Sequence, residues 1–298
     1  MVCPAGEHEI YCCGARVQIS KESGVEVLTE PTIEHCPLHE SLYGIKSIDK
    51  ESVRRSLEMK IARAGFCCPN RAFDADPVVA YGASEMMRVW LEKRLIDCAI
   101  VVCEGAGTVI ATDGELTQSI GARLTGIVRT SPIPRIIKSI EAKGGVVLYR
   151  RTARIDQVEG FKRSSDLGFR RVAVSVAGFQ AKAISEIRSL ESRLDMTALI
   201  FSVCNTCLTV NDVPHISKAD VACASASRIL RSKIGNEAVL QLGVTIPVYA
   251  LTNNGKRFIL AYLAECEYKL VAFRTGKLPY LREGRGPRLR SFARNQKP

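Results

Sequence analysis

The hydrophobic pattern of the chain alternates between short apolar runs and longer stretches of helical periodicity. Residues 97–103, 171–176 and 197–203 are almost entirely apolar, which is typical of strands buried on both faces of a parallel sheet. The stretches between such runs have the length of ordinary helices. This alternation predicts an α/β fold with Rossmann-like βαβ units, in which helices cover both faces of a mostly parallel sheet.

The same pattern predicts the remaining elements of the fold. Asp49 is a typical N-cap for a helix that runs through Ser52 to Ala64 and stops at Gly65. We expect further helices at 82–95, 114–124, 133–143, 156–166, 179–194, 224–235 and 254–266. We expect further strands at 146–149, 219–223, 246–251 and 268–273.

The N-terminal part of the chain lacks this alternation of helices and strands. Residues 8–30 alternate loosely in polarity, and Ser23-Gly24 is a turn sequence. This predicts a β-hairpin extension with strands near 10–19 and 25–29. A loop with Pro and His residues follows at 31–47.

These patterns divide the chain into three expected parts. They are an N-terminal hairpin with a Cys/His loop at 1–48, an α/β domain at 49–273 and a basic tail at 274–298. Comparable turn sequences at Asp97 and Asp220 suggest that the α/β domain has two similar halves, 49–150 and 151–273.

The net charge of +11 lies mainly in the tail. Residues 274–298 contain eight basic residues and one acidic residue. Gly and Pro interrupt the tail and few apolar residues anchor it, so we expect it to be disordered. Two roles fit such a tail: a solubilising end, or a docking arm for an acidic protein or RNA. No nucleic-acid-binding motif accompanies it, so we expect no nucleic-acid partner except through this segment.

The expected cellular location of the protein decides how its cysteines are interpreted. No apolar run is long enough to cross a bilayer, and the N-terminus lacks the pattern of a signal peptide. We therefore expect a cytoplasmic protein with no membrane partner. The chain has twelve cysteines, and in a reducing compartment a disulfide framework is not expected. The cysteines are then buried apolar thiols, metal ligands or redox groups; Cys98 and Cys266 lie in apolar segments typical of a core.

Three cysteines follow the ends of two predicted strands. Cys204 and Cys207 come directly after the run 197–203, and Cys223 closes the run 219–223. Because ligands in open α/β sheets bind beyond the carboxyl ends of the strands, we expect these thiols to meet there. They would hold zinc or an iron–sulfur cluster. A dithiol–disulfide redox pair and simple packing under a turn remain alternatives.

A tetrahedral metal site needs a fourth ligand. The cysteines considered for it are Cys36, Cys67, Cys68 and Cys103, beside a non-protein ligand. Cys36 lies between His35 and His39 in a loop that is better suited to give one ligand to a distant centre than to form a complete site. Adjacent cysteines point in different directions, so one of Cys67 and Cys68 is expected to face the site. We take Cys36 and Cys68 as the candidate additional ligands.

A glycine-containing turn follows the first buried strand. Glu104, Gly105, Gly107 and Thr108 form a candidate cradle whose backbone N–H groups would bind a phosphate or carboxylate. Ile110 stands where a dinucleotide-binding fingerprint needs a small residue, so a plain tight turn is the alternative. The chain shows no serine-hydrolase elbow, no Walker loop and no His-Glu-x-x-His motif.

Several of these segments resemble one archaeal family, methanogenesis marker protein 8. The resemblance covers roughly residues 31–265 and leaves out the basic tail. The segments that carry it are Asp97–Ile110, Thr130–Pro134, Ala153–Gly160, Ala222–Ser225 and Leu240–Val248. It implies an anaerobic cytoplasm and a supporting role in methyl- or alkyl-coenzyme M metabolism, such as maturation or activation of the central reductase. The coenzyme M reductase or its maturation machinery is then the expected partner. The resemblance assigns no catalytic residue.

Two hypotheses from different classes follow. The first is a metal- or iron–sulfur-binding accessory protein with Cys204, Cys207 and Cys223 as ligands. The second is an α/β enzyme or binding protein for a small anionic coenzyme or metabolite, held at the turn Gly105–Thr108. Whether the protein is an enzyme is left open by the sequence.

Overall fold

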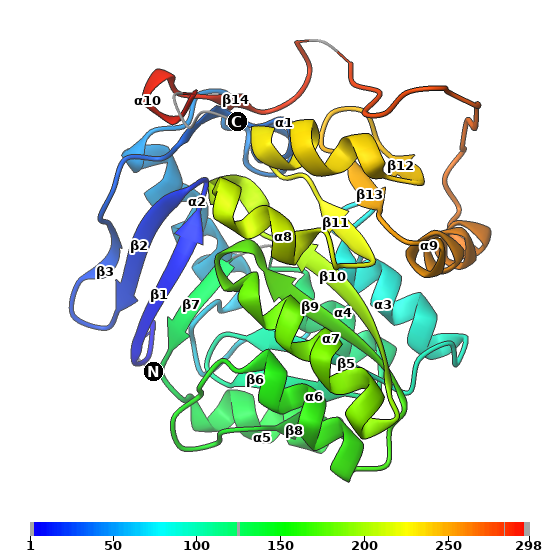
Figure 1. Cartoon of the computed structure of the whole chain (residues 1–298). Coiled ribbons are helices and arrows are strands. Elements are labelled where there is room, and N and C mark those ends of the chain that lie inside the picture. The colour runs from blue at the N-terminus through cyan, green and yellow to red at the C-terminus, as the bar shows by residue number, and fades with distance from the viewer. Residues whose placement is uncertain (1–2, 124–125, 283, 295–298) are drawn as a thin grey trace.

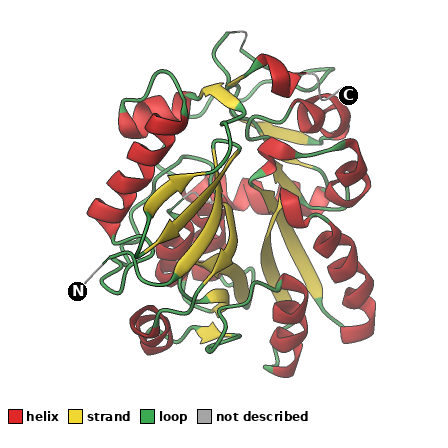
Figure 2. Cartoon of the chain, turned by 90° about the vertical axis from the view of Figure 1, so that its left-hand side faces the viewer, coloured by secondary structure: helices red, strands yellow, loops and turns green. Residues whose placement is uncertain are grey.

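The described part of the chain forms three β-sheets with helices packed around them. A computed structural model describes residues 3–123, 126–282 and 284–294. The sheets have eight, four and two strands. Figure 1 shows the N-terminal strands beside the larger sheet, and Figure 2 shows the two larger sheets side by side from another direction.

The eight-stranded sheet forms the centre of the molecule. Its strands, in spatial order, are β12 (Leu240–Leu242), β13 (Val248–Ala250), β11 (Val221–Cys223), β10 (Thr197–Val203), β9 (Arg171–Ala177), β5 (Cys98–Cys103), β6 (Gly107–Ala111) and β8 (Val146–Val147). The four central strands β5, β9, β10 and β11 are parallel, and the outer neighbours pair antiparallel. The predicted α/β fold is therefore confirmed.

Helices cover both faces of this sheet. One face packs on α3 (Ala83–Glu92), α4 (Gly114–Gly121), α5 (Pro134–Ala142) and α9 (Asn253–Glu265). The other packs on α6 (Gln157–Asp166), α7 (Lys182–Leu194) and a π-helical turn at Leu230–Ile234. The large side chains Trp90 and Phe161 are fully buried, one in each of these two cores. Shorter helical segments are α8 (Val213–Ile216), Gly178–Gln180, Asn205–Cys207, Val210–Asp212 and Gly235–Glu237.

The four-stranded sheet is antiparallel and combines two distant parts of the chain. Its order is β3 (Gly24–Val27), β2 (Ala15–Ser20), β1 (Glu7–Cys12) and β7 (Gly126–Thr130). Helix α2 (Lys50–Ala64) shares a buried core with this sheet. The predicted ends of α2 are confirmed, because Asp49 accepts a hydrogen bond from the Ser52 N–H and Gly65 adopts the left-handed conformation with φ +62°.

The C-terminal segment folds back over the N-terminal part, so the prediction of a disordered tail is wrong for its described residues. Strand β14 (Arg288–Leu289) pairs antiparallel with β4 (Ile33–His35), which is followed by α1 (Pro37–Tyr43). A short helix, α10 (Ser291–Arg294), follows. The red trace in Figure 1 shows this return across the molecule. Backbone pairing thus anchors a segment that has few apolar residues.

Three local predictions also differ from the structure. The segment near 10–19 is two strands, because a tight turn at Cys13-Gly14 separates β1 from β2. Residues 268–273 form no strand, and Val271 within them is 91% exposed. The helix predicted at 224–235 is shorter, because helical structure begins only at Arg228 and continues as the π-helical and 3₁₀ turns given above. Among the described helices, none has the length and apolar character that crossing a membrane requires.

Candidate functional site

A cavity of about 670 Å³ lies between the N-terminal sheet, helices α1 and α2, and the carboxyl ends of β9, β10 and β11. Among the described residues, six cysteines and one histidine line it. They are Cys12, Cys13, Cys36, Cys204, Cys207, Cys223 and His39. Half of the twelve cysteines of the chain therefore face one space, although they come from three separate regions of the sequence.

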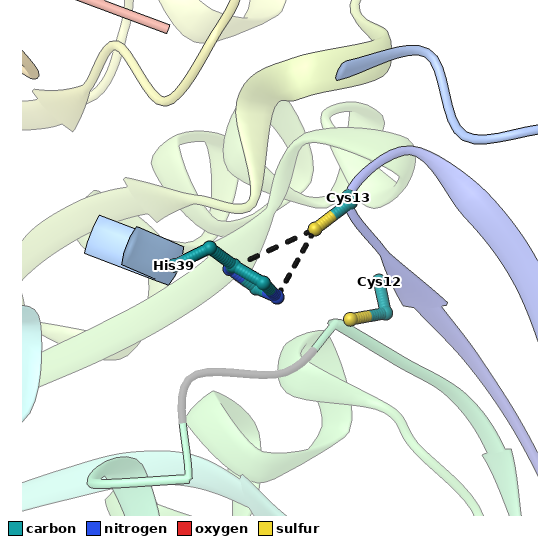
Figure 3. A group of neighbouring side chains, drawn as sticks. All are labelled: Cys12, Cys13 and His39. Carbon is teal, nitrogen blue, oxygen red and sulfur yellow. Dashed lines mark hydrogen bonds between the residues drawn. The ribbon is translucent and has the colours of Figure 1, made fainter. Parts of the chain in front are cut away.

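The hairpin turn between β1 and β2 positions the first two of these thiols. Cys13 and Gly14 have φ values of +52° and +77°, as in the two-residue turns that match the twist of antiparallel strands. Cys12, the last residue of β1, and Cys13 in the turn lie at the end of the hairpin that faces α1 (Figure 3). Gly14 removes the steric cost of the second left-handed position.

Helix α1 brings the imidazole to these thiols. Cys36 is its N-cap and Pro37 its first residue, a position where Pro loses no helical hydrogen bond. His39 lies in the first turn and points toward the hairpin (Figure 3). Its Nε2 atom is 3.2 Å from the Cys13 Sγ atom. One ligand atom each from Cys12, Cys13 and His39 lie within 4.8 Å of one another, so small adjustments would place all three around one ion.

The Cys12 and His39 side chains stabilise each other's charged forms. The hydrogen bond with Cys13 holds the pKa of the Cys12 thiol well below its usual value, and His39 and Lys60 lower that pKa further, against the effect of burial. Burial alone would lower the pKa of His39, but hydrogen bonds with Cys12 and Cys36 raise it to about 9. The metal-free site therefore favours a thiolate at Cys12 beside an imidazolium at His39.

The second group of thiols lies at the ends of β10 and β11. The Asn205 side chain donates a hydrogen bond to the Cys223 carbonyl at 2.8 Å, which ties the two strand ends together. Burial raises the pKa of Cys204 to about 12, and it also raises the pKa of Cys223 and Cys207. These thiols are protonated at neutral pH without a metal, whereas the pKa of Cys12 is shifted in the opposite direction.

The donor set suits a soft metal. Thiolates with imidazole bind zinc, copper(I) or iron–sulfur centres. Each ligand atom is a sulfur or an imidazole nitrogen, and the pKa of the Cys12 thiol is held well below its usual value. The residues around the cavity thus fit either a single soft ion or a cluster.

Four of the thiols predicted as ligands, Cys204, Cys207, Cys223 and Cys36, line the cavity. Among the described residues, however, the group whose ligand atoms lie within 4.8 Å of one another is Cys12, Cys13 and His39, and it includes none of these four. Cys68 is a correction, because it forms a disulfide with Cys3 and does not line the cavity. This pair also departs from the expectation of reduced cysteines throughout.

Two cavity cysteines were missed by the sequence analysis. Cys12 and Cys13 were counted but not proposed as ligands, and His39 was noted only as part of a loop. Ile10 and Cys12 are alternate buried positions of β1, and Gly14 follows them. This local pattern marks the end of the strand and the turn.

The predicted anion cradle at Glu104, Gly105, Gly107 and Thr108 is also corrected. This turn joins two antiparallel strands, β5 and β6, so it does not lead into a helix as a phosphate-binding loop does. Its donors are used within the protein. The Gly105 N–H donates to Thr130 Oγ1 at 2.7 Å, the Ala106 N–H to the Cys103 carbonyl at 3.2 Å, and the Thr108 N–H to the Arg154 carbonyl at 3.2 Å. A phosphate would find no set of open N–H groups there.

Glu104 has a structural partner instead of a ligand. It forms an ion pair with Arg71, and the side chains of Arg71 and Glu104 are 0% and 1% exposed. Arg71 also donates to the carbonyls of Ala72 and Ser119, each at 2.9 Å. The pair joins the loop after α2 to the end of β5 beside the cavity.

Comparison with known proteins identifies the family of this chain. Residues 8–264 match the family model described as "Uncharacterized protein conserved in archaea (DUF2099)", and the chain belongs to this family. A relative from Methanocaldococcus jannaschii, the uncharacterized protein MJ0054, is 36% identical over 272 residues, which cover 90% of this chain and 94% of the relative. The matched region includes all the thiols that line the cavity.

The pKa of Cys12 is lowered and the pKa values of Cys204 and Cys223 are raised, so these thiols should differ in reactivity. In metal-free protein, iodoacetamide should alkylate Cys12 at pH 7 much faster than Cys204 or Cys223, because the thiolate is the nucleophile. The Cys12 rate should rise less from pH 7 to pH 8 than the rates at Cys204 and Cys223, which should rise about tenfold. Peptide mass spectrometry after timed quenching measures each rate.

The substitution His39→Ala tests the cause of this reactivity. Loss of the imidazolium should raise the pKa of Cys12 and slow its alkylation at pH 7 by about tenfold. His35→Ala is the matched control, because His35 interacts with Glu40. An unchanged Cys12 rate in His39→Ala would contradict the thiolate–imidazolium pair.

The buried ion pair predicts a large loss of stability in Glu104→Gln. The neutral amide would leave the Arg71 guanidinium buried without its counter-charge, which costs about 3–5 kcal/mol. Urea unfolding measures the difference. Glu115→Gln, at an exposed position in α4, is the control and should change the free energy of unfolding by about 0.5 kcal/mol or less. Equal effects of the two substitutions would show that Glu104 is not the main partner of Arg71.

Proposed function

We propose that this protein binds a soft metal ion or an iron–sulfur cluster in the thiol-lined cavity and acts as an accessory protein of methyl- or alkyl-coenzyme M metabolism. The observation that supports the metal most directly is the meeting of Cys12, Cys13 and His39, whose ligand atoms lie within 4.8 Å of one another. Zinc or iron would be the metal, because both are bound by thiolate and imidazole.

The seven cavity residues have different parts in this proposal. Cys12, Cys13 and His39 are the first ligands, since their ligand atoms lie within 4.8 Å of one another and the pKa of Cys12 is held well below its usual value. Cys36, Cys204, Cys207 and Cys223 line the same cavity and supply the remaining ligands. A cluster held by four cysteines would draw from both groups.

The metabolic assignment has a separate basis. The segments that resemble methanogenesis marker protein 8 imply a supporting role in methyl- or alkyl-coenzyme M metabolism, in an anaerobic cytoplasm where free thiolates survive. The chain belongs to a family conserved in archaea, which is compatible with that role. The proposed partner is the coenzyme M reductase or its maturation machinery.

Metal analysis tests the centre. Protein purified without oxygen should contain stoichiometric iron or zinc, and iron–sulfur loading should add visible absorption. Replacing both Cys12 and Cys13 with Ser should lower the metal content at least about tenfold, because thiolate ligands supply most of the affinity. The double variant of Cys204 and Cys223 should also lose metal if the two groups share one centre.

The control variant is Cys266→Ser. Cys266 lies at the end of α9, outside the cavity, and its thiol donates to the Leu263 carbonyl. Its metal content should equal that of the unaltered chain. Full metal content in the Cys12/Cys13 double variant would overturn the assignment of these residues as ligands.

The accessory role predicts a physical association in cells. Tagged protein isolated without oxygen from an archaeon of the same metabolism should co-purify with the reductase or a maturation protein. The Cys12/Cys13 double variant should leave the reductase less active in cells that lack the natural copy. Normal reductase activity in cells without this protein would contradict the role while leaving the metal centre untouched.

A further inference from the structure

The cavity is larger than a metal centre needs. Cavities that bind small organic molecules commonly measure about 300–1,000 Å³, and this one measures about 670 Å³. Metal–sulfur bonds of about 2.3 Å confine a mononuclear centre to a small part of such a space. The remainder is wide enough for an organic ligand beside the thiols.

The walls away from the thiols are mainly apolar. They come from the N-terminal sheet, helix α1, the loop before α3 and the inner strands of the large sheet. Representative lining residues are Tyr11, Leu42, Phe66, Val79, Val101 and Phe201. Such a surface contacts hydrocarbon favourably and offers a strongly polar molecule few hydrogen bonds.

Apart from Cys12, whose thiolate form is favoured, the charged groups of the cavity are predominantly positive. The acidic and basic side chains among the described lining residues are Lys60, Arg123, His39 and Glu104. The charge of Glu104 is balanced by Arg71 in the buried ion pair. Lys60 is 8% exposed on α2 and lies near enough to Cys12 and Cys204 to affect both thiols. A cation in this position attracts an anion to the thiol end of the cavity.

We propose that the cavity binds an organic anion with an apolar chain, whose charged end lies near Lys60 beside the thiols and whose chain contacts the apolar walls. The site is distinct from the Gly105–Thr108 turn, where the backbone donors are already used. The proposal goes beyond metal binding, because it concerns the space that a metal centre leaves open. A carboxylate and a phosphate group would both be attracted to Lys60 at this end of the cavity.

Matched short-chain probes test the charge preference on the metal-free protein. Hexanoate should raise the melting temperature, because a ligand that binds the folded state stabilises it. Hexylammonium at the same concentration should give no such rise, and hexanol should give a smaller one. Hexyl phosphate distinguishes a phosphate end from a carboxylate end. An equal rise with hexanoate and hexylammonium would overturn the proposal, and this comparison needs no variant.

Substitution of Lys60 tests the location. Lys60→Met should weaken hexanoate binding about tenfold or more, since a hydrogen bond to a charged group is lost, and should leave hexanol binding unchanged. Lys60→Arg should retain hexanoate binding. Lys50→Met is the control, because Lys50 is exposed on the same helix beside Glu30. Unchanged hexanoate binding in folded Lys60→Met would overturn the assignment. The metal content of the unaltered protein is measured separately, so that a failure of the metal proposal can be told apart from a failure of the anion proposal.

Discussion

The antiparallel pairing of β1 with β7 is the contact on which the cavity depends. β7 lies between helices α4 and α5 in the sequence, yet it pairs with β1 in the N-terminal sheet and not with the large sheet. The register sets Tyr11 opposite Gly126 and His8 opposite Thr130. Because β1 ends at Cys12, this pairing places the first thiols beside the carboxyl ends of β10 and β11. Without it, the two groups of cysteines would belong to separate parts of the molecule.

Two details hold that contact at close range. A Cβ atom at Gly126 would lie 3.5 Å from the Cys204 Sγ atom and 3.1 Å from a ring carbon of Phe179, so a larger side chain would fill the space between the thiol groups. At the other end of β7, Thr130 Oγ1 lies 2.6 Å from the His8 Nδ1 atom and accepts a hydrogen bond from the Gly105 N–H at 2.7 Å. Thr130 therefore connects β1 with the β5–β6 turn.

The difference between what the sequence predicted and what it missed follows from the range of the interactions. Apolar runs and caps are local signals, so the parallel strands and the helix from Asp49 to Gly65 were predictable, as was the position of Cys204 and Cys223 at strand ends. The β1–β7 pairing and the Arg71–Glu104 ion pair join distant segments, and no local pattern encodes them. Glu104 consequently resembled a ligand-binding residue, and Cys12 was not recognised as part of a site.

The two thiol groups also differ in what metal binding requires of them. The pKa of Cys12 is held well below its usual value, whereas burial raises the pKa of Cys204 and Cys223, which must each lose a proton to become ligands. His39, as an imidazolium, and Cys13, whose pKa is raised well above its usual value, must also each lose a proton, so metal binding at the Cys12–Cys13–His39 group releases protons and is weakened as the pH falls. A metal already held there would add positive charge to the cavity and lower the pKa of the remaining thiols. If the metal binds first at Cys12, Cys13 and His39, burial can keep Cys204 and Cys223 protonated until then and still leave them available as ligands.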